Sequence, residues 1–142
     1  MVKIRKARKE DLKEISEIFR RESNKKPYFQ GWTKRTALSN VSKSLKEEDV
    51  HVVMINGEII GFITISLNEK KDVYIGELWL KSKYQRKGIG RLLMEFIEEK
   101  YRKKGSKLIK LTAKKKAYAV KFYKKLNYKI DREYVRMIKK LK

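Results

Sequence analysis

The sequence predicts an α/β fold in which a mixed, mostly antiparallel central sheet is flanked by helices. Apolar residues recur every second position in some segments and every third or fourth position in others. These are the periods of strands and of amphipathic helices. The pair Asn56-Gly57 separates two apolar runs and predicts a tight β-hairpin, because both residues accept a positive φ. A chain of 142 residues is expected to form one domain over residues 1–142.

The first third of the chain predicts a strand and two helices. Val2–Ala7 alternates apolar and basic residues, as a half-buried strand does. An amphipathic helix follows from about Glu10 to Glu22, with acidic residues at its start. Residues 23–32 contain the only proline and three aromatic residues, and they are expected to form a loop. Thr33 is a candidate cap for a second helix, whose apolar positions are Ala37, Leu38, Val41 and Leu45.

The middle of the chain predicts three consecutive strands. Residues 51–55 and 59–67 are the two arms of the predicted hairpin. A polar segment, residues 68–72, leads to a third strand at Val73–Leu80. Short turns between neighbouring strands produce an antiparallel meander. His51 falls at a strand start, where we expect ordinary packing and not catalysis.

The last third predicts two helices and three strands. A long helix is predicted from about Gly88 to Lys104 and ends before a glycine, which is a typical helix terminator. A short strand at Lys107–Thr112 and a further helix at Ala113–Leu126 follow. The sheet is expected to be closed by a strand pair, Tyr128–Ile130 and Val135–Ile138. The predicted order is therefore β-α-α-β-β-β-α-β-α-β-β.

The strongly basic composition bears on the partners of the protein. The 39 Lys and Arg residues outnumber the 17 Asp and Glu residues, which gives a net charge of +22. Such a charge attracts polyanions, so nonspecific contact with nucleic acid or the ribosome is one expectation. However, the basic residues are spread along the chain and mixed with glutamate. Abundant Lys and Glu without Cys is also typical of thermophile surfaces.

Several classes of site are excluded by residue types that the sequence lacks. Without cysteine there is no disulfide, no thiolate metal site and no cysteine nucleophile. The single histidine, His51, supplies too few ligands for a zinc site, so no metal is expected. No apolar run is long enough to span a membrane, and the N-terminus lacks the apolar core of a signal peptide. We therefore expect a cytoplasmic protein without a membrane partner.

A basic, glycine-containing segment, Tyr84–Arg91, lies between the third strand of the meander and the long helix. The first N–H groups of a helix have no intrahelical partner, and the helix dipole places partial positive charge there. Gly88 and Gly90 lack a Cβ, which allows a ligand to approach the backbone closely. The segment, called the glycine loop below, is therefore a candidate phosphate cradle. The alternative is a basic loop that only caps the helix.

The element order and two separated motifs resemble the GCN5-related N-acetyltransferases over essentially the whole chain. Gln85-Arg86-Lys87-Gly88-Ile89-Gly90 meets every fixed position of the family motif Gln/Arg-x-x-Gly-x-Gly/Ala. Ala119-x-x-Phe122-Tyr123-x-x-x-Asn127-Tyr128 is similar to the family motif Ala-x-x-Phe-Tyr-x-x-x-Gly-Phe. Asn127 stands in place of the glycine but tolerates left-handed dihedrals, so the turn is expected to persist.

The resemblance implies acetyl coenzyme A as the acetyl donor. In that family the pyrophosphate lies on backbone N–H groups of the glycine loop, and the backbone of the fourth strand pairs with the pantetheine. Trp79 is large for its position, and the alternative for its side chain is packing in the core. Lys116 stands where many relatives have a cofactor-contacting asparagine; a lysine there could reach a phosphate or face solvent. By resemblance, the cofactor-binding residues are Leu78, Trp79, Leu80, Gln85, Arg86, Lys87, Gly88, Ile89, Gly90, Arg91, Lys116 and Tyr123.

The resemblance also implies direct, sequential acetyl transfer to a primary amine. An ammonium group must lose a proton before it can attack, so a general base is expected. Glu77, the only carboxylate of the fourth strand, is the candidate; the alternatives are Glu22, Glu47 or a chain of waters. Glu77 could instead face solvent or pair with a lysine. Tyr123 matches the family tyrosine that commonly protonates the leaving thiolate; its alternative is packing on the sheet.

Acceptor choice is expected to depend on the first two helices and on the aromatic loop residues Tyr28, Phe29 and Trp32. The alternative for these rings is that they cover one end of the core. The acceptor amine could belong to a small molecule, a protein N-terminus or a lysine, and an acidic protein surface would suit the net charge. The rival function is a non-catalytic nucleic-acid- or ribosome-binding module on the same fold. A homodimer is a further expectation.

Overall fold

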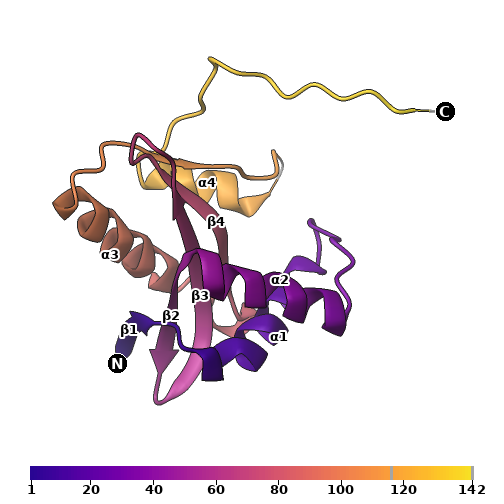
Figure 1. The fold of residues 1–142 in the computed structure, drawn as a ribbon, viewed down its shortest axis with the longest axis vertical. Helices are drawn as coiled ribbons and strands as arrows, with labels where there is room; N and C mark the ends of the chain where they lie inside the picture. Colours follow the sequence, from indigo (N-terminus) through magenta and orange to yellow (C-terminus); the bar gives the residue numbers. More distant parts are fainter. Residues whose placement is uncertain (116, 142) are drawn as a thin grey trace. The chain divides into compact units, whose positions relative to one another are not determined.

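The computed structural model describes residues 1–115 and 117–141. The chain divides into two compact units, Met1–Thr112 and Ala113–Lys142, and each is described by itself. The first unit contains a sheet with helices on both faces (Figure 1), and the predicted α/β class is confirmed. The prediction that one domain covers residues 1–142 stays a prediction.

The first unit is built on a five-stranded sheet with the order β1-β2-β3-β4-β5. The first three pairings are antiparallel and the last, β4 with β5, is parallel, so the predicted meander is confirmed. A parallel pairing requires a crossover, and α3 (Ile89–Lys103) provides it. The strands are β1 (Val2–Lys6), β2 (Asp49–Ile55), β3 (Glu58–Leu67), β4 (Val73–Leu80) and β5 (Ile109–Leu111).

The β2–β3 hairpin turns at the predicted Asn-Gly pair. Asn56 has a φ of 50° and Gly57 a φ of 79°, which are the positive values that this tight turn requires. A second irregularity lies between β3 and β4, where Thr64 pairs with Glu77 and Ile65 pairs with Ile75. Gly76 is therefore an extra residue, and β4 carries a β-bulge immediately before Glu77.

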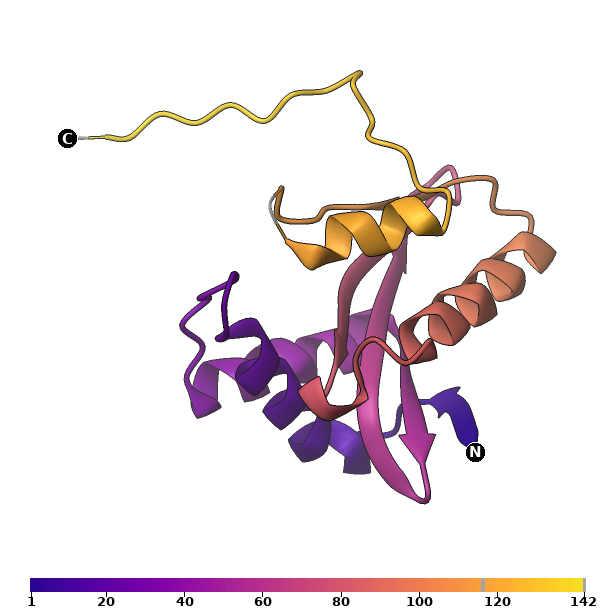
Figure 2. The same cartoon turned by 180° about the vertical axis from the view of Figure 1, so that it is seen from behind.

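Three helices cover the sheet of the first unit. Figures 1 and 2 show α1 (Leu12–Ser23) and α2 (Lys34–Glu47) on one face and α3 on the opposite face. The predicted cap of α2 is confirmed, because the Thr33 hydroxyl accepts a hydrogen bond of 3.1 Å from the backbone N–H of Thr36. The predicted end of α3 is also confirmed, since Gly105 follows the helix with a φ of 91°. Short 3-10 turns precede α1 and the glycine loop, at η1 (Lys9–Asp11) and η2 (Ser82–Tyr84).

The core of the first unit has one layer on each face of the sheet. On the face of α1 and α2, Phe19 packs edge-on to Phe62 with ring centroids 6.5 Å apart. On the other face, α3 buries Leu93, Met94 and Ile97 completely. Each fully buried side chain of this size stabilises the fold by about 1.5–3 kcal/mol. His51 is also buried, and its ring lies 5.5 Å from that of Phe96, in agreement with the expected packing role.

The second unit contains α4 (Tyr118–Lys125), which is shorter than the predicted helix at Ala113–Leu126. The predicted closing strands, Tyr128–Ile130 and Val135–Ile138, are wrong for the described residues 128–141, none of which is in a strand. Their apolar side chains are exposed: Ile130 by 59%, Val135 by 80% and Ile138 by 78%. The alternating pattern predicts an extended backbone, but a strand also needs a neighbour to bond its N–H and C=O groups.

None of the helices in the described part of the chain combines the length and the apolar character that crossing a membrane requires.

Candidate active site

The glycine loop follows β4 and η2 and ends at the N-terminus of α3. Gly88 precedes the first helical residue with a φ of 83°, and no side chain among the described residues caps the helix. A Cβ at Gly88 would have no other heavy atom within 4 Å, so the space beside it is open. An anion in this space would meet uncapped N–H groups and the positive end of the helix dipole. The loop therefore has the geometry of a phosphate cradle.

The side chains of the glycine loop differ in their exposure to solvent. Arg86, Lys87 and Arg91 are exposed, so their charges are accessible to an anionic ligand. Arg91 also pairs with Glu95 one helical turn later, at 3.4 Å. In contrast, Ile89 is only 5% exposed and anchors the helix in the core. Of the expected cofactor-binding residues, Ile89 can therefore contribute only its backbone.

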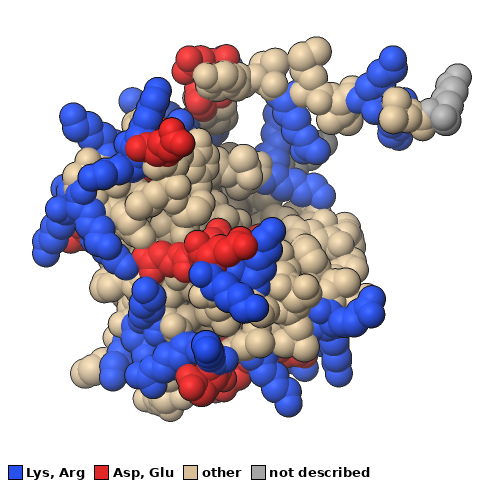
Figure 3. Space-filling model, in the orientation of Figure 1, with Lys and Arg blue, Asp and Glu red and all other residues tan. Residues whose placement is uncertain are grey.

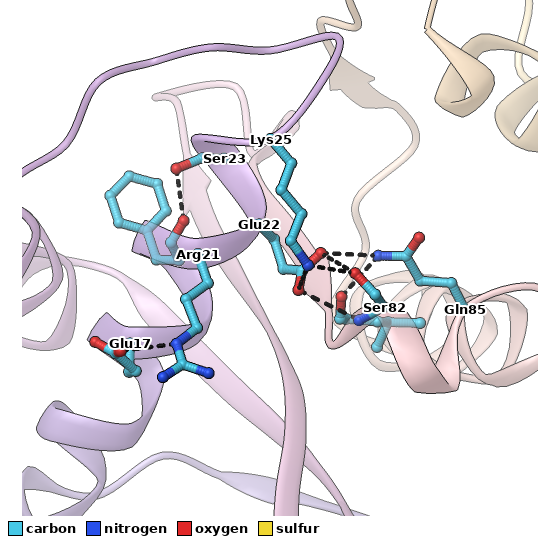
Figure 4. Close-up of polar contacts among 9 residues, drawn as sticks. Glu17, Arg21, Glu22, Ser23, Lys25, Ser82 and Gln85 are labelled. Atoms are coloured by element: carbon cyan, nitrogen blue, oxygen red, sulfur yellow. Dashed lines mark hydrogen bonds and ion pairs between the residues drawn. The ribbon is translucent and has the colours of Figure 1, made fainter.

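The side chain of Gln85 ties the glycine loop to β4 and α1. Its amide donates to the backbone carbonyl of Leu80 at 2.8 Å and to the Glu22 carboxylate at 3.3 Å. The same carboxylate accepts from the hydroxyl of Ser82 at 2.9 Å, as Figure 4 shows. Gln85 thus shapes the start of the loop. The carboxylate of Glu22, an expected alternative base, accepts hydrogen bonds from both Gln85 and Ser82.

Glu77, directly after the bulge in β4, is hydrogen-bonded to Thr64 and Trp79. Its backbone N–H donates to the hydroxyl of Thr64 at 2.9 Å, and its carboxylate accepts from the indole N–H of Trp79 at 2.6 Å. Burial raises the pKa of the Glu77 carboxyl; the Trp79 hydrogen bond lowers it, and the nearby Glu48 carboxylate raises it again. Among the described residues, no Lys or Arg lies within ion-pair distance of Glu77, so the expected alternative of a lysine partner is not found.

The expected acceptor residues separate into three environments. The ring of Tyr28 packs edge-on to Trp79 with centroids 4.9 Å apart, which places it in the group that contains Glu77. Burial raises the pKa of its hydroxyl. The ring of Trp32 packs against that of Phe19, with centroids 4.9 Å apart, and so covers the core. This was the alternative to a role in acceptor binding. Phe29 is 65% exposed.

Trp79 itself packs against the core cluster of α1 and α2, with its indole directed to Glu77 and Tyr28. The side chain of Trp79 therefore packs in the core, which was the alternative to a contact with the cofactor. Leu78 and Leu80, its neighbours in β4, are half-buried. Any contact of Trp79 with a cofactor would thus come from its backbone.

Two residues of this site were not singled out from the sequence. Glu48 follows α2 directly, and its carboxylate lies 3.6 Å from the position that a Cβ on Gly76 would occupy. Thr64 supplies the hydroxyl that bonds Glu77, and a Cβ on Gly76 would lie only 2.8 Å from it. A glycine inside an apolar strand pattern is a known signal of a bulge, and Gly76 carried that signal. Glu47, the expected alternative base, is exposed.

Tyr123, the expected general acid, lies in α4 of the second unit. Its ring packs against Phe122 at 5.0 Å and against Tyr128 at 5.6 Å. Asn127 adopts a φ of 71°, which confirms the expected left-handed turn after the helix. Lys116, an expected cofactor residue, lies outside the described residues.

The sequence also matches a family model. Residues 7–128 match the model described as the acetyltransferase (GNAT) family, which covers most of the chain and both motifs. The chain belongs to the acetyltransferase (GNAT) family. The glycine loop of this GNAT protein and the strand before it lie within the matched residues.

One relative matches part of the sequence of this GNAT protein, and solved structures share its fold at low sequence identity. It is 36% identical over 84 residues to the uncharacterized protein YxbD of Bacillus subtilis (strain 168), a match that spans 51% of that protein's length. A possible acetyltransferase from Clostridium difficile 630 has a TM-score of 0.83 and 18% identity, covering 100% of this chain and 99% of that one. An aminoglycoside N-acetyltransferase solved with CoA has a TM-score of 0.80 and 14% identity, covering 99% and 96%.

Proposed function

We propose that this protein is an N-acetyltransferase that moves the acetyl group of acetyl coenzyme A to a primary amine by direct, sequential transfer. The observation that carries the proposal is the open, uncapped N-terminus of α3 behind Gly88. Family membership indicates the same chemistry, and an aminoglycoside N-acetyltransferase of the same fold was solved with CoA. One acetyltransferase domain over residues 1–142 is part of the proposal, since the family match runs through both units.

The glycine loop would hold the cofactor's pyrophosphate. The backbone N–H groups from Arg86 to Arg91 bind anionic oxygens, and the exposed Arg86 and Lys87 add charge-assisted contacts. The backbone of Leu78 to Leu80 is the edge available to the pantetheine amides. When bound, acetyl coenzyme A supplies the acetyl group as a thioester.

Glu77 would take the proton of the acceptor ammonium. A half-buried carboxylate with a raised pKa and no basic partner among the described residues is a better proton acceptor than an exposed one. Trp79 bonds the carboxylate and Tyr28 packs against Trp79, so these two rings would form the wall of the acceptor site. Tyr123 would give its hydroxyl proton to the leaving thiolate. The transfer has no covalent enzyme intermediate on sulfur, because the chain has no cysteine.

The acceptor is proposed only as an amine of a small molecule, protein or peptide. Its class can be found by screening aminoglycosides, lysine peptides and free N-terminal peptides for release of the CoA thiol. Release that requires both acetyl coenzyme A and one acceptor class supports the proposal. A protein that binds no CoA and releases no thiol with any class would refute it.

A second candidate is a nucleic-acid- or ribosome-binding module, favoured by the net charge of +22. Figure 3 shows Lys and Arg dispersed over the visible face with Asp and Glu among them, and not gathered into one stripe. Thermal shift at moderate salt separates the two functions. Stabilisation by acetyl coenzyme A alone supports the enzyme, and stabilisation by an RNA oligomer alone supports the module. The homodimer and the cytoplasmic location stay predictions.

A further inference from the structure

Glu22 is a buried carboxylate at the end of α1, with only 7% of its surface exposed. Buried carboxylates require hydrogen-bond donors, and Glu22 has several. It accepts from the backbone N–H of Ser82 at 3.3 Å and from the Ser82 hydroxyl at 2.9 Å. It also accepts from the amide of Gln85 at 3.3 Å and from the ammonium of Lys25 at 3.1 Å (Figure 4).

The stability of α1 does not explain this carboxylate. An acid in the last turn of a helix faces the negative end of the helix dipole, where a basic residue is preferred. Glu17, on the same helix, shows the ordinary surface arrangement: it pairs with Arg20 at 2.6 Å and with Arg21 at 2.8 Å. Glu22 instead directs its oxygens away from its own helix, to a segment that begins 60 residues later.

The donors of Glu22 belong to two loops of the first unit. Gln85 lies in the glycine loop and Ser82 in η2, the turn that leads into it, whereas Lys25 belongs to the aromatic loop, residues 24–32. The carbonyl of Lys25 accepts from the backbone N–H groups of Tyr28 at 2.9 Å and Phe29 at 3.1 Å. The ammonium of Lys25 also donates to the Ser82 hydroxyl at 2.6 Å. A displacement of the glycine loop would therefore disturb the bonds that hold the aromatic loop.

We propose that Glu22 is a positioning residue that fixes the glycine loop for the cofactor and couples it to the aromatic loop. The inference rests on the proposed function, in which the glycine loop binds coenzyme A and the aromatic loop lines the acceptor site. Two sites that share one set of contacts influence each other reciprocally. Occupation of the glycine loop therefore orders residues 24–32.

The first test is the affinity for coenzyme A of the purified full chain. Glu22→Gln keeps the size of the side chain but replaces one acceptor oxygen by an NH2 group, which faces two of the donors to Glu22 in either orientation of the amide. We expect its Kd, from calorimetry, to rise by about tenfold. Glu17→Gln is the matched control, because it removes a carboxylate of the same helix that touches neither loop; its Kd should equal that of the wild type.

The second test measures hydrogen exchange of residues 24–32. In the wild type, coenzyme A should slow exchange of the Tyr28 and Phe29 amides, which bond Lys25. In Glu22→Gln this protection should disappear at saturating coenzyme A, whereas Glu17→Gln should retain it. A role in stability alone would lower the melting temperature without changing this response.

The outcomes separate the two proposals. A wild-type protein that does not bind coenzyme A would refute the proposed function itself. A wild type that binds it, together with a Glu22→Gln variant of the same Kd and the same protection, would refute the role of Glu22. If Glu22→Gln does not fold, Ser82→Ala replaces it as the test variant, because this change removes one donor to Glu22 at an exposed residue. A Kd and a protection of residues 24–32 equal to those of the wild type in Ser82→Ala would equally refute the inference.

Discussion

The indole N–H of Trp79 donates a hydrogen bond of 2.6 Å to the carboxylate of Glu77. The two residues are two positions apart in β4, so both side chains lie on the same face of the sheet. The bond favours the ionised carboxylate and opposes the effect of burial on the pKa of Glu77. The proton affinity of the proposed base is therefore set by three effects: burial, the hydrogen bond from Trp79 and the negative charge of Glu48.

Replacement of Trp79 by Phe removes the hydrogen bond and leaves burial and Glu48 in place, so the pKa of Glu77 should rise. A base must be ionised to act, and activity falls as the pH drops through its pKa. The acidic limb of the profile of kcat/KM against pH should therefore move to higher pH. Turnover should also fall, because the Glu77 carboxylate loses the hydrogen bond that orients it. Trp32→Phe, which also loses an indole, should leave the position of this limb unchanged.

Replacement of Glu48 by Gln should have the opposite effect on the same limb. It removes a negative charge that raises the pKa of Glu77, so the carboxylate should ionise at lower pH. The change is measured as a shift of the acidic limb to lower pH with turnover near that of the wild type. Glu47→Gln, at the exposed neighbouring position, tests the alternative base: a large loss of turnover there would transfer the role from Glu77 to Glu47.

Glu77→Gln should abolish most of the activity and yet raise the melting temperature at neutral pH. The folded state raises the pKa of Glu77 above its unfolded value, so the ionised carboxylate lowers stability at every pH above that raised value. This penalty fades as the pH falls through the raised pKa and is absent below the unfolded pKa. The variant should thus be more stable than the wild type at pH 7 and equal to it in acid. Equal melting temperatures at both pH values would contradict the role of burial.

Gly88→Leu should weaken the binding of coenzyme A by about tenfold or more, because the side chain would occupy the open space beside the helix N-terminus. Gly57→Leu is the matched control. Gly57 has a φ of 79°, against 83° at Gly88, and a Cβ there also meets no atom within 4 Å. Both variants carry similar backbone strain, and only Gly88→Leu should lose affinity in calorimetry. An equal loss in both would attribute the effect to strain.

Tyr123→Phe should lower turnover by about tenfold or more while the Kd for coenzyme A stays the same, because only the transferable proton is lost. Tyr128→Phe removes a hydroxyl from a ring that contacts Tyr123 and serves as the control. Wild-type turnover in Tyr123→Phe would remove this residue from the acid role.

Most of the first unit was predictable from the sequence because its signals are local. The Asn56-Gly57 turn, the Thr33 cap and the terminator Gly105 each act through their own backbone dihedrals or a neighbour within a few residues. The glycine loop was found for the same reason. The closing strands failed because pairing is a property of two segments in space, and the apolar pattern within residues 128–141 does not tell whether a strand lies beside either segment.

The surroundings of Glu77 could not be predicted, because they depend on register. Thr64 reaches its N–H only because the bulge at Gly76 shifts β4 by one residue against β3. Glu48 comes close only because α2 ends at this point of the sheet. Likewise, nothing in the sequence near Glu22 indicates that Ser82 and Gln85, 60 and 63 residues later, donate hydrogen bonds to it.

The strand order of the first unit also has a consequence for how the chain folds. β2, β3 and β4 are joined by short turns, so their pairing closes small loops, whereas β5 reaches β4 only after the chain has passed through α3. Closing a longer loop costs more entropy, and contacts distant in sequence slow folding. We expect the β2–β4 meander to form in the transition state and β5 to dock afterwards. Destabilising changes in the Asn56-Gly57 turn should therefore slow refolding, and those in β5 should mainly accelerate unfolding.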